Sequence, residues 1–327
     1  MKRFCMTLWV CVAALVLLEG WGGYSPVMGA VNENKSQKLS VLASFYPMYD
    51  FAVKIGGERV SVTNMVPAGM EPHDWEPAAA DIAELEKAAV FVYNGAGMEH
   101  WVSDVLGVLQ NRALITVEAS KGIKLLEGHH HESHEDEHED EHEDEEHDHE
   151  HEDEVHDPHV WLSPVYAKAE LENIKNALVQ ADPEGKSYYE ANYEKYAAEC
   201  DALDKEFTNI LAPLPKKDIV VTHQAFGYIC ERYGLRQVPI EGLSPDSEPD
   251  PGRMAEIIDF VKEHGVKVIF FEELASPKVA ETIAKATGAA TDMLSPMEGL
   301  GEEEIASGID YFAVMRRNLK SLAAALQ

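Results

Sequence analysis

The chain has 327 residues, of which 45% are hydrophobic and 8% aromatic, enough apolar content to bury one large or two medium cores. Its 59 acidic residues against 27 basic ones give a formal net charge of -32. A polyanion of this kind repels phosphate backbones, so nucleic acid is excluded as an expected partner. Two domains are the expected organisation for this length.

The first 30 residues are predicted to be a secretion signal. Two basic residues open the chain, an apolar stretch runs from Cys5 to Leu18, and small residues stand at Gly29 and Ala30. The apolar stretch is short for a membrane span, so we expect residues 1–30 to be removed during export. An uncleaved anchor is the alternative.

From residue 38 onward, short β-rich runs alternate with helical segments. In the first half we predict strands near Leu39–Ser44, Val60–Met65, Val90–Tyr93 and Leu114–Val117, and helices near Tyr46–Ile55, Ala78–Lys87, His100–Leu109 and Ala167–Gln180. In the second half we predict strands near Ile219–Thr222, Val238–Ile240, Val266–Phe271 and Ala290–Leu294, and helices near Gln224–Tyr233, Gly252–His264, Pro277–Thr287 and Glu302–Leu326. This alternation predicts an α/β protein with about four βα units and a parallel sheet in each half.

A histidine- and acid-rich tract interrupts the first half. Residues 129–156 contain ten histidines and sixteen acidic residues, and such a composition cannot bury a core. We therefore predict a disordered loop over 128–156 that binds metal weakly. Its candidate ligands are His129, His130, His131, His134, His138, His142, His147, His149, His151 and His156.

The most regular helical pattern lies between the two halves. Tyr189, Tyr193, Tyr196, Cys200, Leu203, Phe207 and Ile210 follow alternating spacings of three and four residues, which predicts one apolar stripe along a long helix. Pro183 can begin this helix and Pro213 ends it. We interpret the helix, 183–212, as a stiff strut between an N-terminal lobe (31–182) and a C-terminal lobe (213–327). An ordinary amphipathic helix within one domain is the alternative.

Three histidines lie where predicted strands run into helices. His73 follows a strand, His159 precedes a helix, and His223 stands directly at the end of a strand. Open parallel sheets place their ligands at this edge, and neutral imidazole is the commonest metal ligand. The sequence therefore predicts one metal ion held by imidazoles from both halves.

Several acidic residues lie close to these predicted ligands. Asp157 and Asp74 stand beside two of the histidines, and each can orient a ring or cap a helix. Glu272 and Glu273 follow a predicted strand. We interpret both as solvated, with a ring-orienting role for one of them as the alternative.

Five segments in this order, GMEPHDWEP, NGAGMEHW, DPHVWL, VVTHQAFGY and LSPMEGL, resemble the metal-binding solute-binding proteins of bacterial ABC transporters, specifically their zinc-type branch. The resemblance covers nearly all of residues 38–327. It implies two (β/α)4 lobes bridged by one long rigid helix, with the metal in the cleft between them. It also implies a periplasmic, monomeric carrier without catalytic activity, whose partner is a membrane permease.

Carried over by motif, the resemblance implies metal ligands at His73, His159 and His223. In other branches of the family an Asp occurs late in the chain, where this sequence has Ser295. The resemblance implies Glu298 as the fourth ligand, because similar zinc-type members use the glutamate of the LSPMEGL motif, with Asp292 and water as alternatives. A set of three imidazoles and one carboxylate suits tetrahedral Zn²⁺ better than Mn²⁺, although Cu²⁺ and Ni²⁺ also bind nitrogen-rich sites.

Two other functions remain open at this point. Three histidines with an open fourth position also suit a zinc-dependent hydrolase. The HExxH pattern occurs at His134–His138 and His138–His142, but only inside the low-complexity tract, which has no apolar face to hold the helix that this motif requires. The second alternative is a secreted protein that buffers metal or mediates adhesion.

Cys200 and Cys230 remain after signal removal, and the sequence does not decide whether they form a disulfide.

Overall fold

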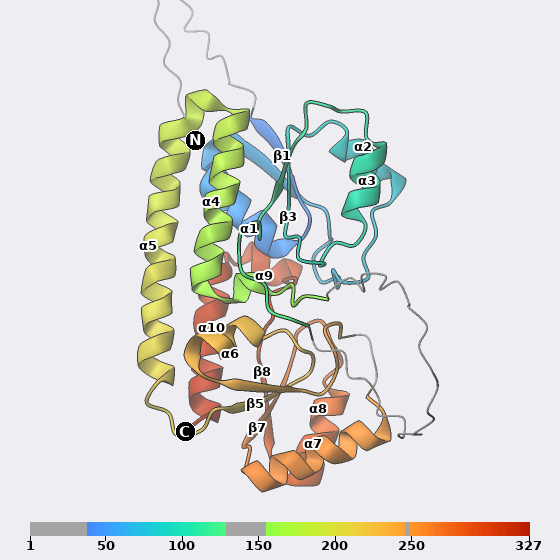
Figure 1. Cartoon of the computed structure of the whole chain (residues 1–327), viewed down its shortest axis with the longest axis vertical. Helices are drawn as coiled ribbons and strands as arrows, with labels where there is room; N and C mark the ends of the chain where they lie inside the picture. The colour runs from blue at the N-terminus through green and yellow to red at the C-terminus, as the bar shows by residue number, and fades with distance from the viewer. Residues whose placement is uncertain (1–37, 129–154, 246–248) are drawn as a thin grey trace, which may run out of the picture. The chain divides into compact units, whose positions relative to one another are not determined.

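Two four-stranded parallel sheets organise the fold (Figure 1). The computed structural model describes residues 38–128, 155–245 and 249–327, so the predicted signal peptide and most of the histidine- and acid-rich tract lie outside the described residues. The first sheet has the order β2-β1-β3-β4 and the second the order β6-β5-β7-β8. Every neighbouring pair is parallel. The strands are β1 (Leu39–Ala43), β2 (Val60–Asn64), β3 (Val90–Tyr93), β4 (Ile115–Glu118), β5 (Asp218–Val221), β6 (Arg236–Pro239), β7 (Val268–Phe271) and β8 (Ala290–Met293).

The strand order of each sheet reverses once, and this reversal fixes where a site can form. The chain leaves β1 for β2 on one side and then returns to place β3 on the other side of β1. The second sheet repeats this arrangement with β6 and β7 on either side of β5. At such a switch point the connections after neighbouring strands run in opposite directions, which opens a crevice at the carboxyl ends of the strands.

Helices cover the sheets as the alternating pattern predicts. They are α1 (Tyr46–Gly56), α2 (Ala79–Leu85), α3 (Val102–Val108), α4 (Pro164–Ala181), α6 (Gly227–Tyr233), α7 (Pro251–His264) and α8 (Lys278–Thr287). Short 3-10 turns occupy Gly57–Arg59, Val160–Leu162 and Pro183–Gly185. Local chemistry sets the ends of α7: the side chain of Asp250 accepts hydrogen bonds from two backbone amides of the first turn, and Gly265 ends the helix in the left-handed conformation, at a φ of 59°.

The long helix predicted between the halves is α5, Lys186–Leu211. It lies beside α4 and α10 (Figure 1). The predicted start at Pro183 is three residues too early, because Pro183–Gly185 form a 3-10 turn in which Asp182 accepts from the Gly185 amide. Most of the apolar stripe is buried, with Tyr193 and Tyr196 partly buried. Ile210 is 42% exposed, and Leu211 is the buried residue of the last turn. The expectation of two parallel α/β lobes with one long helix is confirmed.

The C-terminal segment departs from the prediction. Instead of one helix over 302–326, the chain forms α9 (Glu302–Ala306) and α10 (Tyr311–Ala325). Gly308 adopts a φ of 80° between them, and the Asp310 side chain begins α10 by accepting from the backbone amide of Ala313. The same carboxylate accepts from Lys54 of α1 at 2.8 Å. The break therefore docks the start of α10 on the first half of the chain.

One hydrophobic cluster joins side chains from both halves. Phe51 of α1 packs edge-on against Tyr311 of α10, with ring centroids 5.0 Å apart.

Cys200 and Cys230 are both buried and both free thiols. None of the helices in the described residues combines the length and apolar character that a bilayer span requires.

Candidate metal centre

His73 enters the site from the long connection between β2 and α2. Its backbone amide donates to Glu71 Oε1 at 3.1 Å, which fixes the turn that carries the ring. Its Nε2 lies 3.1 Å from Glu298 Oε1. The side chain is 11% exposed, and the other three residues of the group are more deeply buried. His73 therefore stands on the solvent side of the site.

His159 precedes the 3-10 turn Val160–Leu162 and is fully buried. The carboxylate of Asp157 accepts two hydrogen bonds from it, one from the ring Nδ1 at 2.7 Å and one from the backbone amide at 3.0 Å. The opposite ring nitrogen, Nε2, lies 2.9 Å from Glu298 Oε1. The sequence-based hypothesis that Asp157 orients this ring is thus confirmed by the contact.

His223 follows β5 directly and is fully buried. Glu272, which follows the neighbouring strand β7, accepts from the ring Nδ1 at 2.6 Å and from the backbone amide at 3.2 Å. The two residues meet because β5 and β7 are neighbours at the switch point of their sheet. The ring Nε2 lies 3.2 Å from Glu298 Oε1 and 3.3 Å from His159 Nε2.

Glu298 lies in the connection that follows β8 and is 1% exposed. Two features shape this loop. The indole Nε1 of Trp161 donates to the carbonyl of Pro296 at 2.8 Å, and Met297 adopts a φ of 60°, a left-handed conformation that a non-glycine residue rarely takes. One carboxylate oxygen, Oε1, is thereby presented to all three histidine rings.

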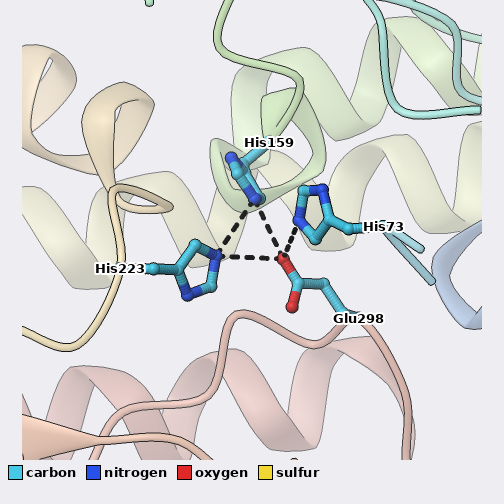
Figure 2. A group of neighbouring side chains, drawn as sticks. All are labelled: His73, His159, His223 and Glu298. Atoms are coloured by element: carbon cyan, nitrogen blue, oxygen red, sulfur yellow. Dashed lines mark hydrogen bonds and ion pairs between the residues drawn. The ribbon is translucent and has the colours of Figure 1, made fainter. Parts of the chain in front are cut away.

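The four side chains converge on one point (Figure 2). One potential ligand atom from each of His73, His159, His223 and Glu298 lies within 4.8 Å of the others. Tetrahedral Zn²⁺ with bonds of about 2.0–2.2 Å separates its ligand atoms by roughly 3.3 Å. The contacts of 2.9–3.3 Å that His159 and His223 make with each other and with Glu298 are close to that separation. Small movements of the side chains would accommodate one ion.

The electrostatics of the group favour a cation. Burial alone lowers the pKa of His223, but the charges of Glu272 and Glu298 overcome this and raise the pKa well above its ordinary value. Burial opposes the charge of His159 as well, yet its hydrogen bonds to Asp157 and Glu298 leave its pKa raised. For Glu298, burial acts to raise the pKa, and the charges of His223 and His73 outweigh it and hold the pKa well below the ordinary range. The pocket therefore stabilises positive charge at the His159 and His223 rings.

Two acidic residues near the site were not assigned correctly from the sequence. The interpretation of Glu272 as solvated is wrong, since it is 4% exposed and holds the His223 ring. Glu71 was not singled out, although it has a visible signal, a carboxylate two residues before His73 in the same motif. Its burial and the nearby charge of Glu298 raise its pKa to about 8.

The remaining candidates lie outside the four-residue group. Asp292, an alternative fourth ligand, is exposed on β8. Ser295 is buried in the turn before Glu298, where its hydroxyl donates to Glu273 and its backbone amide donates to the side chain of Asn318. Asp74 is exposed.

Only His156 of the ten tract histidines lies in the described part of the chain. It forms an isolated antiparallel bridge with Glu127, and the backbone amide of Gly128 donates to the carbonyl of Val155 at 2.7 Å. These contacts bring the two ends of the tract together. A cavity of about 420 Å³ is lined by His73, Ala96, Gly97, Val155, His156, Pro158, Leu243 and Ser244. The C-terminal end of the tract, Val155 and His156, therefore borders the same cavity as His73, the most exposed residue of the candidate site.

Fold and site together define a class: a two-lobed binding protein with a buried three-histidine, one-glutamate group between its sheets. Residues 41–325 match the family described as "Zinc-uptake complex component A periplasmic". The chain belongs to this family, as the resemblance in its sequence motifs had indicated.

Known proteins similar to this chain carry zinc-related names. The chain is 44% identical over 315 residues to the high-affinity zinc uptake system protein ZnuA of Bacillus subtilis (strain 168), covering 96% of each. It is 41% identical over 285 residues to the zinc-binding protein AdcA of a Streptococcus pyogenes strain, covering 87% of this chain but only 55% of the length of AdcA.

A solved structure gives the same picture at the level of the fold. The Zn(II)-bound ZnuA-like domain of Streptococcus pneumoniae AdcA is 36% identical to this chain and superimposes with a TM-score of 0.74. The match covers 88% of this chain and 99% of that domain.

Proposed function

We propose that this protein captures a zinc ion between His73, His159, His223 and Glu298 and delivers it to the membrane permease of an ABC importer. The single observation that carries this proposal is the convergence of three imidazoles and one carboxylate from both halves of the chain within 4.8 Å. Family membership and the zinc-related names of the relatives support the same cargo.

The residues around the four proposed ligands prepare them for a metal. Asp157 and Glu272 each accept from an Nδ1 atom, so the Nε2 lone pairs of His159 and His223 face the ion. Glu298 is 1% exposed, and its negative charge stabilises a divalent cation more strongly in this buried position than it would at the surface. Zinc binding then displaces the ring protons, so capture is coupled to proton release.

We further propose that the protein has no catalytic activity. Zinc hydrolases leave one coordination position to the water that attacks the substrate. Here the buried Glu298 carboxylate occupies the fourth position and contacts all three rings. Hydrolysis of a substrate that depends on added zinc and is lost with His223→Ala would overturn this part of the proposal.

The proposed organisation follows from the carrier function. Residues 1–30 direct export and are removed, and the mature monomer works outside the cytoplasm, in the periplasm. Lobes 31–182 and 213–327, joined by the helix of 183–212, enclose the ion and offer surfaces from both lobes to the permease. We propose that the tract of 128–156 is a weak, multi-site collector that raises the local zinc concentration beside the cleft.

A growth experiment tests the proposal. A strain that lacks the gene should grow poorly in chelator-treated medium, and either added zinc or the wild-type gene should restore growth. The gene carrying His159→Ala together with His223→Ala should not restore it, although the protein is exported in equal amount. Full rescue by the double variant, or normal growth of the deletion strain, would contradict the proposal.

A further inference from the structure

The hydroxyl group of Tyr228 connects segments that are far apart in the sequence. Tyr228 is fully buried in α6, five residues after His223. Its hydroxyl donates to the carbonyl of Asp157 at 2.7 Å and accepts from the backbone amide of Leu126 at 3.1 Å. Leu126 precedes the tract and Asp157 follows it, and they also pair with each other, since the Asp157 amide donates to the Leu126 carbonyl at 2.9 Å. One hydroxyl therefore ties both ends of the tract to the helix that follows His223.

Asp157 carries this connection on to His159. Its carbonyl is held by Tyr228, while its carboxylate holds both the ring and the backbone amide of His159. All three residues are nearly inaccessible to solvent. Tyr228 is thus linked to the His159 ring by two hydrogen bonds, both made to Asp157. Asp157 is buried, and its side chain is short.

The packing of α6 against Asp157 is close enough to exclude a side chain. A Cβ added at Gly227 would lie 2.4 Å from Asp157 Oδ2, well inside contact distance. The glycine at the start of α6 therefore permits the approach that lets the next residue, Tyr228, reach the Asp157 carbonyl. The segment is also held from the first half, where the Asn94 side chain donates to the Pro158 carbonyl at 2.9 Å.

We propose that Tyr228 is a positioning residue of the metal site, one that fixes the spacing between His159 and His223 without touching the ion. Asn94 fastens the His159 segment to the first sheet, and Tyr228 fastens the same segment to the helix after His223. The separation of 3.3 Å between the two Nε2 atoms is held by this bracing. A fixed, short separation favours a small tetrahedral ion over a larger one, because longer bonds would need the two ligand segments to move apart.

This inference rests on the proposed function, since it assumes that the four-residue group binds zinc. It adds that selectivity is set by a residue outside the coordination sphere. It also implies that movement of the tract does not change the positions of the metal ligands, because the Tyr228 hydroxyl holds the segments on both sides of the tract.

The test compares Tyr228→Phe with Tyr233→Phe in the full chain. Tyr233 is a matched control: it lies on the same helix, and its hydroxyl donates to Asp204 of α5 at 3.0 Å, away from the site. Affinities for Zn²⁺ and Cd²⁺ are measured against a tight chelator, under conditions in which weak sites stay empty, and the visible absorption of the Co²⁺ form reports coordination geometry.

Tyr228→Phe should weaken Zn²⁺ binding by roughly 10-fold, within the range known for groups that orient metal ligands, and should weaken Cd²⁺ binding less. It should also change the Co²⁺ spectrum, whereas Tyr233→Phe should lower thermal stability and leave the affinities and the spectrum unchanged. A Tyr228→Phe protein with the wild-type Zn²⁺ to Cd²⁺ preference and spectrum would overturn the inference, and so would equal shifts in both variants.

A second variant keeps the test decisive if Tyr228→Phe does not fold. Gly227→Ala retains the hydroxyl and pushes on Asp157, and should shift the Zn²⁺ to Cd²⁺ preference in the same direction. An unchanged preference in Gly227→Ala would count against the inference. Failure of the wild type to hold one zinc tightly would refute the proposed function instead, so the two failures are distinguishable.

Discussion

Replacing Glu272 by Gln changes the charge beside the His223 ring while nearly preserving its shape. Glu272 is 4% exposed, and its two oxygens accept from the ring Nδ1 at 2.6 Å and from the His223 amide at 3.2 Å. A glutamine has one acceptor oxygen in place of two and carries no charge. It can keep the ring hydrogen bond or the amide hydrogen bond, but not both.

The two hydrogen bonds that Glu272 accepts set the expected loss of zinc-binding free energy. A buried hydrogen bond to a charged acceptor exceeds a neutral one by about 1 kcal/mol, and the second, lost acceptor leaves a buried amide unsatisfied at a cost of about 1 kcal/mol more. If the loss falls on the zinc-bound form, the total of about 2 kcal/mol corresponds to roughly 30-fold weaker zinc binding.

The loss of zinc affinity in Glu272→Gln should depend on pH and should be larger at high pH than at low pH. Glu272 is the main charge that raises the pKa of His223 against the effect of burial, so the wild type must remove a tightly held proton before zinc binds. In Glu272→Gln that proton is held less tightly and competes less. The affinity ratio of wild type to variant should therefore be largest at alkaline pH, where the ring proton no longer competes with zinc, and should shrink as the pH falls.

Chelator competition at a series of pH values measures this ratio, and Glu273→Gln is the control. Glu273 is the next residue along the chain and is also buried enough for its pKa to rise to about 7, but its carboxylate accepts from the Ser295 hydroxyl and not from a ring. Equal losses in the two variants, or a ratio for Glu272→Gln that grows as the pH falls, would show that the Glu272 charge does not act on zinc binding through the His223 ring.

Three further predictions concern the same site. His159→Ala or His223→Ala removes one of four ligands, about a quarter of a binding free energy of the order of 12 kcal/mol, so each should weaken zinc binding at least 100-fold in a chelator titration. Deleting 129–154 should lower the number of zinc ions seen by native mass spectrometry and leave one tight ion, because Gly128 and Val155 are already adjacent; loss of that ion would contradict the division between tract and site. Because the folded-state pKa values of His159 and His223 are raised, protonation of these rings stabilises the metal-free protein below about pH 6.5, and this stabilisation is lost as the pH rises through the raised values. Calorimetry in buffers of different ionisation enthalpy should accordingly show proton release on zinc binding at neutral pH, and enthalpies independent of the buffer would contradict it.

The positions of the strands and most helices could be predicted from local patterns. Val90–Tyr93 and Tyr46–Gly56, for example, correspond to apolar runs with clear turn signals on either side. The break at Gly308 was missed, because the apolar pattern continues through it. What stabilises the break is the contact of Asp310 with Lys54, more than 250 positions earlier in the chain.

The candidate site shows the same division between local and long-range information. The three histidines could be found because His223 ends a strand, His159 precedes a helical segment and His73 lies in the connection after a strand, and the structure brings them together with Glu298. The role of Glu272 depends on β5 and β7 being neighbours, a pairing that no local pattern reveals. The role proposed for Tyr228 is a similar case, since it depends on the hydrogen bond from its hydroxyl to Asp157, 71 positions away.

The most direct test of the proposed metal centre is a crystal structure of the zinc-loaded protein, with anomalous scattering at the zinc edge to locate the ion. We expect a single fully occupied zinc within about 2.0–2.2 Å of the Nε2 atoms of His73, His159 and His223 and of one oxygen of Glu298. A fully occupied zinc held elsewhere, with these four side chains beyond bonding distance, would contradict it.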